Sequence, residues 1–208
     1  MATAPSLSNP PATLGIVETF HSVQGEGYWA GTNAFFIRLA GCDVGCPWCD
    51  TKVSWNPKRH PQVPIVTLRD QVQEAQPRLV IITGGEPLLQ DLTPLTQALQ
   101  PLGYPLHLET SGAYPLRGEV DWITLSPKLF KPPQPSLYAL AHELKVVIAS
   151  PEDFSWAEQQ REQVNPEIPC YLQPEWGQRE APAWIYDYVL GNPQWRLSLQ
   201  THKVLAVR

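Results

Sequence analysis

The chain has 208 residues, of which 43% are apolar, and this content is enough for a folded core and excludes an intrinsically disordered protein. Its formal net charge of −5 argues against a protein that binds duplex nucleic acid, because such proteins present a basic face to the phosphates. The 23 prolines exclude long helices as the dominant structure, since proline interrupts helix interiors.

The N-terminal segment is predicted to be a lead rather than a folded element. Residues 1–14 are rich in Ser, Pro and Ala, and they lack the basic start and the apolar stretch of a signal peptide. No run of the chain approaches the ~18 to 20 consecutive apolar residues that a membrane span needs. We therefore expect a flexible lead at residues 1–14, one domain at residues 15–208, no membrane or nucleic-acid partner, and a cytoplasmic location that keeps the thiols reduced.

Six short runs in the chain are predicted to be strands. They are rich in Val, Ile, Leu or Phe, are bounded by Gly or Pro, and cover residues 34–40, 79–83, 106–110, 122–125, 144–149 and 169–173. Three helices are predicted between them, the first opened by a capping pair at Thr67 and Asp70 and reaching about Ala75. The second covers residues 91–101, and the third begins with Ser150 as its N-cap.

The order of these elements predicts the fold class. Strands that alternate with helices indicate an α/β fold with a mostly parallel sheet. Two connections, residues 111–121 and 126–143, are rich in Pro and look too irregular for ordinary helices. We therefore expect a partial TIM-like barrel, open and depleted of helices, rather than eight complete strand–helix units.

Three of the four cysteines, Cys42, Cys46 and Cys49, lie directly after the first predicted strand. Loops at strand ends are where α/β enzymes place their sites, and three thiolates this close can coordinate one soft metal or one iron–sulfur cluster. A structural zinc site is normally closed by four ligands, so it would need Cys170 or a histidine as well. Three ligands leave one position open for chemistry, and a closed zinc site remains the alternative.

A second motif follows about forty residues later. Residues 79–87 form a predicted strand that ends in Gly84-Gly85-Glu86-Pro87. Glycine permits close approach of the backbone to a ligand, and Glu86 supplies a carboxylate acceptor. Alone, these four residues would predict an ordinary strand-to-helix turn, but after the cysteine triad they indicate a ligand site.

The two motifs together resemble those of the radical S-adenosylmethionine (SAM) superfamily. The resemblance rests on Cys-x3-Cys-x2-Cys, with Trp48 before the third cysteine, and on Gly-Gly-Glu-Pro. It implies a [4Fe–4S] cluster on Cys42, Cys46 and Cys49, with SAM chelating the fourth iron and yielding a 5′-deoxyadenosyl radical after one-electron reduction. It also implies that the Gly-Gly-Glu-Pro motif holds the methionine amino group.

Further motifs narrow the resemblance to the 7-carboxy-7-deazaguanine synthase family. They follow in the expected order across residues 18–176 and include Ser-Val-Gln-Gly-Glu-Gly at 22–27 and segments 36–39, 49–51, 109–112, 126–128, 143–145 and 173–174. The resemblance implies a lyase that contracts the ring of 6-carboxy-5,6,7,8-tetrahydropterin to 7-carboxy-7-deazaguanine with loss of ammonia, in 7-deazapurine and queuosine biosynthesis. It further implies Mg²⁺, a homodimer, and flavodoxin or ferredoxin as electron donor.

The resemblance assigns site residues position by position. Thr51 matches the Mg²⁺ ligand, with Asp50 as an alternative. The substrate-binding residues are Val23, Gln24, Gly25, Glu26, Arg38, Thr83, His202 and Arg208, the last through a C-terminal carboxylate. The SAM-binding residues are Trp48, Gly85, Glu86, Glu109, Ser126, Pro127, Lys128, Gln173, Pro174, Glu175 and Trp176, with Ser111 and Lys145 as further candidates.

Several alternatives remain open from the sequence. Arg38 offers a bidentate fork for the substrate carboxylate, but it could instead form a surface ion pair. The C-terminal segment could be a docked terminal strand. Another small radical SAM enzyme, such as a glycyl-radical activase, has no need of the Gln24–Gly27 stretch with Arg38 and Thr51. An iron–sulfur carrier without radical chemistry would leave the Gly-Gly-Glu-Pro motif and Lys128 without a purpose.

Overall fold

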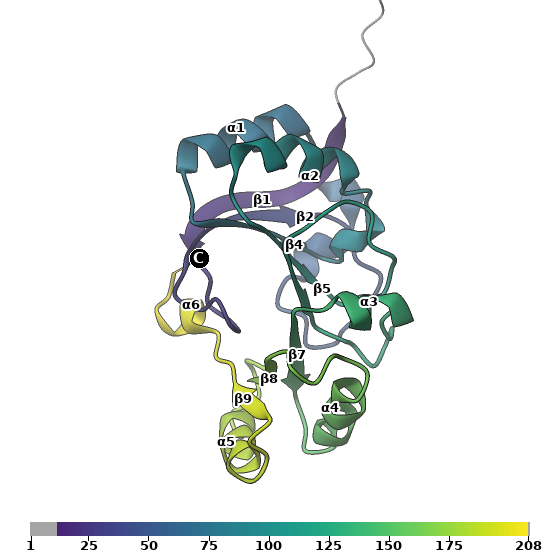
Figure 1. Ribbon diagram of the computed structural model, residues 1–208, viewed down its shortest axis with the longest axis vertical. Coiled ribbons are helices and arrows are strands. Elements are labelled where there is room, and N and C mark those ends of the chain that lie inside the picture. The colour runs from purple at the N-terminus through teal and green to yellow at the C-terminus, as the bar shows by residue number, and fades with distance from the viewer. Residues whose placement is uncertain (1–11, 208) are drawn as a thin grey trace, which may run out of the picture.

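A single curved sheet organises the computed structural model, which describes residues 12–207 (Figure 1). Its nine strands follow the order β3-β1-β2-β4-β5-β6-β7-β8-β9. β1 runs antiparallel to β2 and β3, and the neighbouring pairs from β2–β4 to β8–β9 are parallel. The strands are β1 (Thr13–Val23), β2 (Asn33–Leu39), β3 (Gln62–Pro64), β4 (Leu79–Gly84), β5 (Leu106–Thr110), β6 (Trp122–Leu125), β7 (Glu143–Ile148), β8 (Cys170–Pro174) and β9 (Trp195–Leu197).

Helices cover the outer face of this sheet, with α1 and α2 beside β1 and β2 and with α4 and α5 at the other end (Figure 1). The helices are α1 (Ile65–Ala75), α2 (Thr93–Leu99), α3 (Pro135–Leu140), α4 (Asp153–Arg161) and α5 (Ala181–Gly191), with the short α6 (Thr201–Val204) lying elsewhere. None of the helices in residues 12–207 combines the length and the apolar composition that a membrane crossing requires.

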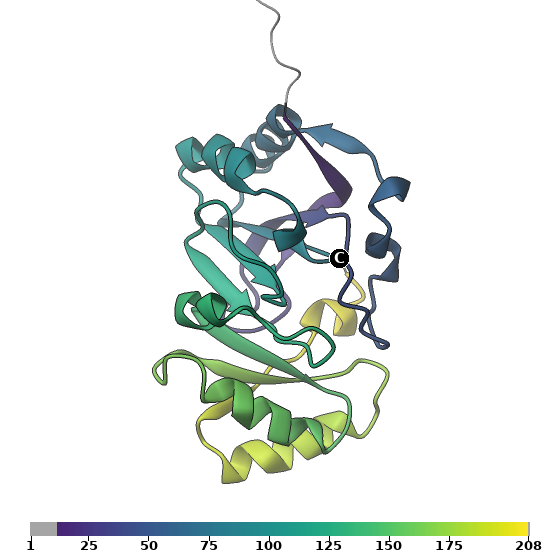
Figure 2. The ribbon, with the colours of Figure 1, turned by 90° about the vertical axis from the view of Figure 1, so that its right-hand side faces the viewer.

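The sheet curls into an incomplete barrel, which confirms the predicted fold class. Its two ends, β3 and β9, do not pair with each other in the described part of the chain, so the barrel stays open between them. α6 lies on this open side, next to the loop that follows β1 (Figure 1). Figure 2 shows the segment between β2 and β3 on the same side of the molecule as α6.

Alternation along the strands divides the side chains between two faces of the sheet. In β2, Phe35 and Ile37 pack with the helices in the main core, whereas Ala34 and Phe36 belong to a small separate cluster on the other face. Successive side chains of a strand point to opposite faces, so Arg38 shares the inner face with Phe36. The same spacing places polar residues of β4 to β8 on the inner face near the carboxyl ends of the strands.

All six predicted strands are present within one or two residues of their predicted ends. Sequence patterns missed β1, β3 and β9. Thr13 and Leu14, which were predicted to belong to the N-terminal lead, are the first two residues of β1, and residues 1–11 lie outside the described residues.

The predictions for the helices need correction at α1, α3 and α4. α1 begins at Ile65 rather than at Thr67. Ser150 is not the N-cap of α4, because the helix begins at Asp153 and its N-cap residue is Glu152. The Asp153 carboxylate accepts the backbone N–H groups of Ala149 and Ser150, both at 2.8 Å. The connection 126–143 was expected to lack an ordinary helix, yet it contains α3, in which Pro135 occupies the first turn, where a missing N–H costs nothing.

Candidate active site

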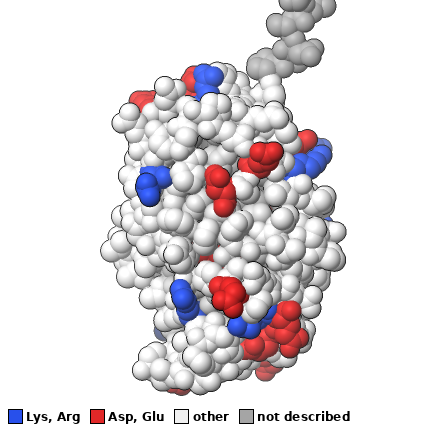
Figure 3. Space-filling model, viewed as in Figure 1, with Lys and Arg blue, Asp and Glu red and all other residues white. Residues whose placement is uncertain are grey.

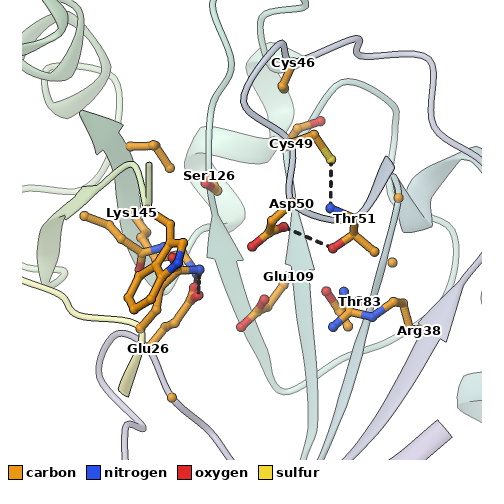
Figure 4. A pocket seen from close by; sticks show the side chains of 18 of the residues that line it. Glu26, Arg38, Cys46, Cys49, Asp50, Thr51, Thr83, Glu109, Ser126 and Lys145 are labelled. Atoms are coloured by element: carbon orange, nitrogen blue, oxygen red, sulfur yellow. Dashed lines mark hydrogen bonds and ion pairs between the residues drawn. The ribbon is translucent and has the colours of Figure 1, made fainter. Parts of the chain in front are cut away.

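The carboxyl ends of the parallel strands surround a pocket of about 350 Å³. Its walls come from the loop after β1, the cysteine loop after β2, the ends of β4, β5 and β8, and the C-terminal segment. In Figure 4 Cys46 and Cys49 lie at one end of this pocket, while Glu26 and Lys145 lie across it from Arg38 and Thr83. The pocket thus brings together residues from almost the whole length of the chain.

Nearly every predicted site residue lines this pocket. The exceptions are Pro127, which is not among the lining residues, and Arg208, which lies outside the described residues. Sequence reasoning missed Glu18, Gln200 and Lys203, which also line it. If β1 had been recognised as a strand, Glu18 could have been placed on the same face as Phe20, which lies two residues further along. Gln200 and Lys203 carry no comparable signal in the sequence.

The cysteine loop is folded tightly against the second motif. Gly85 allows this approach, because a Cβ atom there would overlap the Gly41 carbonyl oxygen and the Cys42 side chain. The Gly41 carbonyl accepts the Glu86 N–H at 2.8 Å, which joins the two motifs directly. Burial raises the pKa of the Cys42 thiol and of the Cys46 thiol, so bound iron would have to supply the charge that keeps them ionised.

The cysteine side chains fit an iron–sulfur cluster better than a single zinc ion. Cys42, Cys46 and Cys49 gather in one small apolar cluster with Trp48. Within residues 12–207, however, no three His, Cys, Asp or Glu side chains are placed to hold one metal ion. A cuboidal cluster needs a wider spacing, because each thiolate binds a different iron. Cys170 is buried in β8 away from the pocket, so it is no fourth ligand there.

The carboxylate of Glu86 is occupied by the protein itself. One oxygen accepts the Leu88 N–H at 2.9 Å and the Thr110 hydroxyl at 2.6 Å. The other accepts the N–H and the hydroxyl of Ser111, at 2.9 and 2.5 Å. Four donors use the whole acceptor capacity of a carboxylate, so the side chain joins the β4 turn to the end of β5. The backbone N–H of Glu86 is also engaged, by the Gly41 carbonyl oxygen, so the predicted SAM contact of Glu86 stays a prediction.

Lys128 lies at the cysteine end of the pocket and is held by Ser126. Its ammonium group donates to the carbonyl and hydroxyl oxygens of Ser126, at 2.5 and 2.6 Å, and lies 5.8 Å from the centre of the Trp48 ring. Burial lowers the pKa of Lys128 to about 8. The group is thus a poorly hydrated cation beside the thiols, suited to an anionic ligand group.

Opposite the cysteines, the pocket wall is built from charged side chains of the inner face. Lys145 pairs with Glu26, and Gln200 donates to the other oxygen of Glu26 at 2.8 Å. Burial opposes ionisation of Glu26, but the charge of Lys145 prevails and holds the pKa of Glu26 below its ordinary value. Arg38 forms the ion pair of the alternative interpretation, with Glu18 at 3.0 Å, and it also lines the pocket.

The loop after β1 reaches across the open side of the barrel and is held there by polar contacts. Gln24 donates to Glu109 at 2.6 Å, and the Tyr28 N–H donates to Glu143 at 3.1 Å. A Cβ atom at Gly27 would overlap the Glu143 carboxyl group, so only glycine permits this packing. These contacts join the β1 end of the sheet to β5 and β7 without any strand pairing.

Replacing Glu143 with Gln is expected to stabilise the protein by an amount that grows with pH. Burial raises the pKa of Glu143 from 4.5 to about 7, so the folded state keeps its proton over a range in which the unfolded chain has lost it. Ionisation therefore costs stability progressively between about pH 4.5 and pH 7, and the cost is constant above. An amide does not titrate and can still accept the Tyr28 N–H.

Urea unfolding of both proteins at pH 5, 6, 7 and 8 measures this effect. The difference in unfolding free energy should change by roughly 2 kcal/mol in favour of Glu143→Gln between pH 5 and pH 8. A difference that stays constant over this range would show that the pKa of Glu143 is the same in the folded and the unfolded protein.

Thr51 lies at the end of the cysteine loop, where it forms hydrogen bonds with Cys49 and Asp50. Its hydroxyl donates to Asp50 at 3.0 Å, and its backbone N–H donates to the Cys49 sulfur at 3.4 Å (Figure 4). The second oxygen of Asp50 accepts the Lys203 ammonium group at 2.5 Å. A hydroxyl and a carboxylate side by side offer the hard oxygen ligands that Mg²⁺ prefers.

Charged side chains are sparse on the face that carries the open side of the sheet. In Figure 3 the Lys and Arg side chains on this face lie singly or next to Asp and Glu side chains.

Comparisons with known proteins agree with this site. A family model described as "Radical SAM superfamily" matches residues 36–132. The chain is 58% identical over 193 residues to 7-carboxy-7-deazaguanine synthase of Synechocystis sp. (strain ATCC 27184 / PCC 6803 / Kazusa), covering 93% of each chain. It is 33% identical over 220 residues to the enzyme of that name from Escherichia coli (strain K12), covering 92% of this chain and 98% of that one. The crystal structure of QueE from Escherichia coli superposes with a TM-score of 0.79 at 30% identity, covering 90% and 94% of the two chains.

Proposed function

The chain belongs to the 7-carboxy-7-deazaguanine synthase family of radical SAM enzymes, and from that premise we propose that it contracts 6-carboxy-5,6,7,8-tetrahydropterin to 7-carboxy-7-deazaguanine with loss of ammonia. The observation that carries the proposal is one pocket with three thiols at one end and Glu26, Arg38 and Lys145 around the other. The curated relatives share the synthase name, so a glycyl-radical activase is not favoured.

We propose that Cys42, Cys46 and Cys49 hold a [4Fe–4S] cluster, and that SAM lies between the cysteine loop and the ends of β4 and β8. When bound, the cluster and SAM supply a 5′-deoxyadenosyl radical. The chain orients SAM through the backbone of Gly85 and through Trp176 at the end of β8. The Lys128 ammonium group, which is largely removed from water, neutralises anionic charge beside the thiols.

On the other side of the pocket, the charged groups suit a carboxylated pterin. Arg38 presents a planar fork to a carboxylate, and Gln24 and Glu26 supply the donors and acceptors that an amide-like pterin edge requires. Thr51, with Asp50, is the proposed Mg²⁺ ligand, since one hydroxyl with substrate oxygens and waters completes the coordination that Mg²⁺ favours. His202 closes this side, because its ring lies against Gly25.

The proposal includes partners that the pocket chemistry requires. Cluster reduction needs a one-electron donor, for which flavodoxin or ferredoxin is proposed. A homodimer would cover the sheet edge at β9, where Leu197 is exposed. A cytoplasmic location would keep the three cluster thiols reduced, and the product would feed queuosine or another 7-deazapurine.

Anaerobic reconstitution tests the proposed reaction. With iron, sulfide, reductant, SAM and the carboxytetrahydropterin, the protein should form 7-carboxy-7-deazaguanine and ammonia, identified by absorbance and mass. Chelator-treated protein should regain full rate on addition of Mg²⁺. Formation of 5′-deoxyadenosine alone would leave the radical SAM activity in place and refute the proposed substrate, and turnover without any divalent cation would refute the Mg²⁺ site.

A further inference from the structure

The C-terminal helix α6 touches three walls of the pocket that are far apart in sequence. The N–H and the hydroxyl of Thr201 both donate to the Gly25 carbonyl oxygen at 3.0 Å, which joins α6 to the loop after β1. His202 packs on the same glycine. Lys203 pairs with Asp50 of the cysteine loop at 2.5 Å. A helix of four residues is thus held by contacts outside itself.

The ammonium group of Lys203 has an unusually complete set of partners for a residue near a chain end. Besides Asp50, it donates to the Gln200 side-chain oxygen at 3.0 Å and lies 5.3 Å from the centre of the Trp176 ring. Its side chain is only 19% exposed, whereas that of Asp50 is 53% exposed. One cation therefore joins the cysteine loop, the segment after β8 and α6.

This arrangement distinguishes Lys203 from an ordinary surface ion pair. Exposed pairs contribute little, because water solvates both partners and long side chains lose entropy. Lys203 is mostly shielded from water and meets an anion, an amide oxygen and an aromatic face at once. Of the ion pairs described in residues 12–207, it is also the one that ties α6 to the rest of the chain. Loss of the ammonium group would release α6 from two of its three walls.

We propose that Lys203 is a positioning residue that fastens α6 across the open side of the barrel and thereby keeps His202 against Gly25 at the substrate end of the pocket. The inference rests on the proposed function for the identity of that substrate as a carboxylated pterin. Lys203 acts through α6 and need not touch the substrate. Its removal should therefore weaken substrate binding without changing the chemistry at the thiols.

The test compares Lys203→Ala and Lys203→Met with Lys203→Arg, which keeps both the charge and the contact with the ring. Lys52→Ala is the matched control, because Lys52 lies 5.9 Å from the centre of the Trp55 ring in the segment after the cysteine loop. None of the ion pairs described in residues 12–207 joins Lys52 to α6. The first readout is millisecond hydrogen exchange of residues 199–207 in the reconstituted protein without SAM or substrate. The second is KM for the pterin and for SAM.

Lys203→Ala and Lys203→Met should exchange the amides of α6 about tenfold faster and raise KM for the pterin by a similar factor, as expected for the loss of a hydrogen bond to a charged group. KM for SAM should rise by a smaller factor than KM for the pterin, because Trp176, which Lys203 contacts, is one of two groups proposed to orient SAM. Lys203→Arg and Lys52→Ala should behave as the parent protein. Unchanged exchange in Lys203→Ala would overturn the inference, and so would an equal rise of both KM values. If no variant turns over the pterin but the exchange differs as stated, the positioning role stands and the proposed function fails.

Discussion

Replacing Cys46 with Ala is expected to abolish SAM cleavage and product formation, to the background of an assay without protein. Cys46 is buried beside Cys42, Cys49 and Trp48, and alanine offers no ligand atom in its place. A cluster held by two thiolates has two coordination positions that the protein does not fill, and iron is lost from it. The measurements are iron and sulfide content, the cluster absorbance, and 5′-deoxyadenosine formed with reductant.

Cys170→Ala is the matched control for this experiment. Cys170 is also buried, but it lies in β8 outside the pocket, and its thiol donates to the Ile168 carbonyl oxygen at 3.5 Å. The variant should load a full cluster and cleave SAM at the parent rate, with at most a modest loss of stability from the small cavity. A cluster retained in Cys46→Ala, or lost in Cys170→Ala, would overturn the assignment of the three iron ligands.

Lys145→Met is expected to destabilise the folded protein by about 3–5 kcal/mol, because it leaves the buried carboxylate of Glu26 without its partner. The side chains of Lys145 and Glu26 are 6% and 13% exposed, and Glu109 and Glu143 also lie close enough for their charges to act on Lys145. The burial of Lys145 opposes its charge, yet the surrounding carboxylates hold its pKa above the ordinary value. Removing the charge of Lys145 leaves the carboxyl groups of Glu26, Glu109 and Glu143 facing one another without it.

Urea unfolding at pH 7 measures this loss, and the melting temperature should fall by roughly 10 °C. The double variant Glu26→Gln with Lys145→Met supplies the control. It removes both charges, so it should lose much less stability than Lys145→Met alone. Equal losses in the single and double variants would show that packing of the lysine stem, and not charge pairing, carries the effect.

The same contacts explain how an incomplete barrel can enclose a site. Strand pairing stops at β3 and β9, and side chains complete the wall between them. Glu143 holds the backbone of Tyr28, and Ser198 accepts the N–H of Gly27 at 3.0 Å. A wall made of side-chain contacts opens at lower cost than a strand pair, so we expect this part of the barrel wall to be less stable than the paired strands.

The sequence alone was sufficient to find the two motifs and six of the strands of this protein. The spacing of Cys42, Cys46 and Cys49, the glycines of the second motif and the six apolar strands are all short-range patterns, and short-range patterns are legible without a fold. β3 and β9 escaped notice because three residues carry too little periodicity. β1 has partly exposed residues over most of its length, so its alternation is weak.

Only the tertiary structure decided which polar side chains meet. Glu26 and Lys145 are 119 residues apart in the chain, and Asp50 and Lys203 are 153 residues apart. Neither pair can be recognised from the neighbouring residues, because the sequence around a charged residue does not indicate which distant residue it pairs with. The hydrogen bonds that Thr110 and Ser111 donate to the Glu86 carboxylate could not be predicted for the same reason. Partners are set by the curl of the sheet, which brings distant strand ends around one pocket.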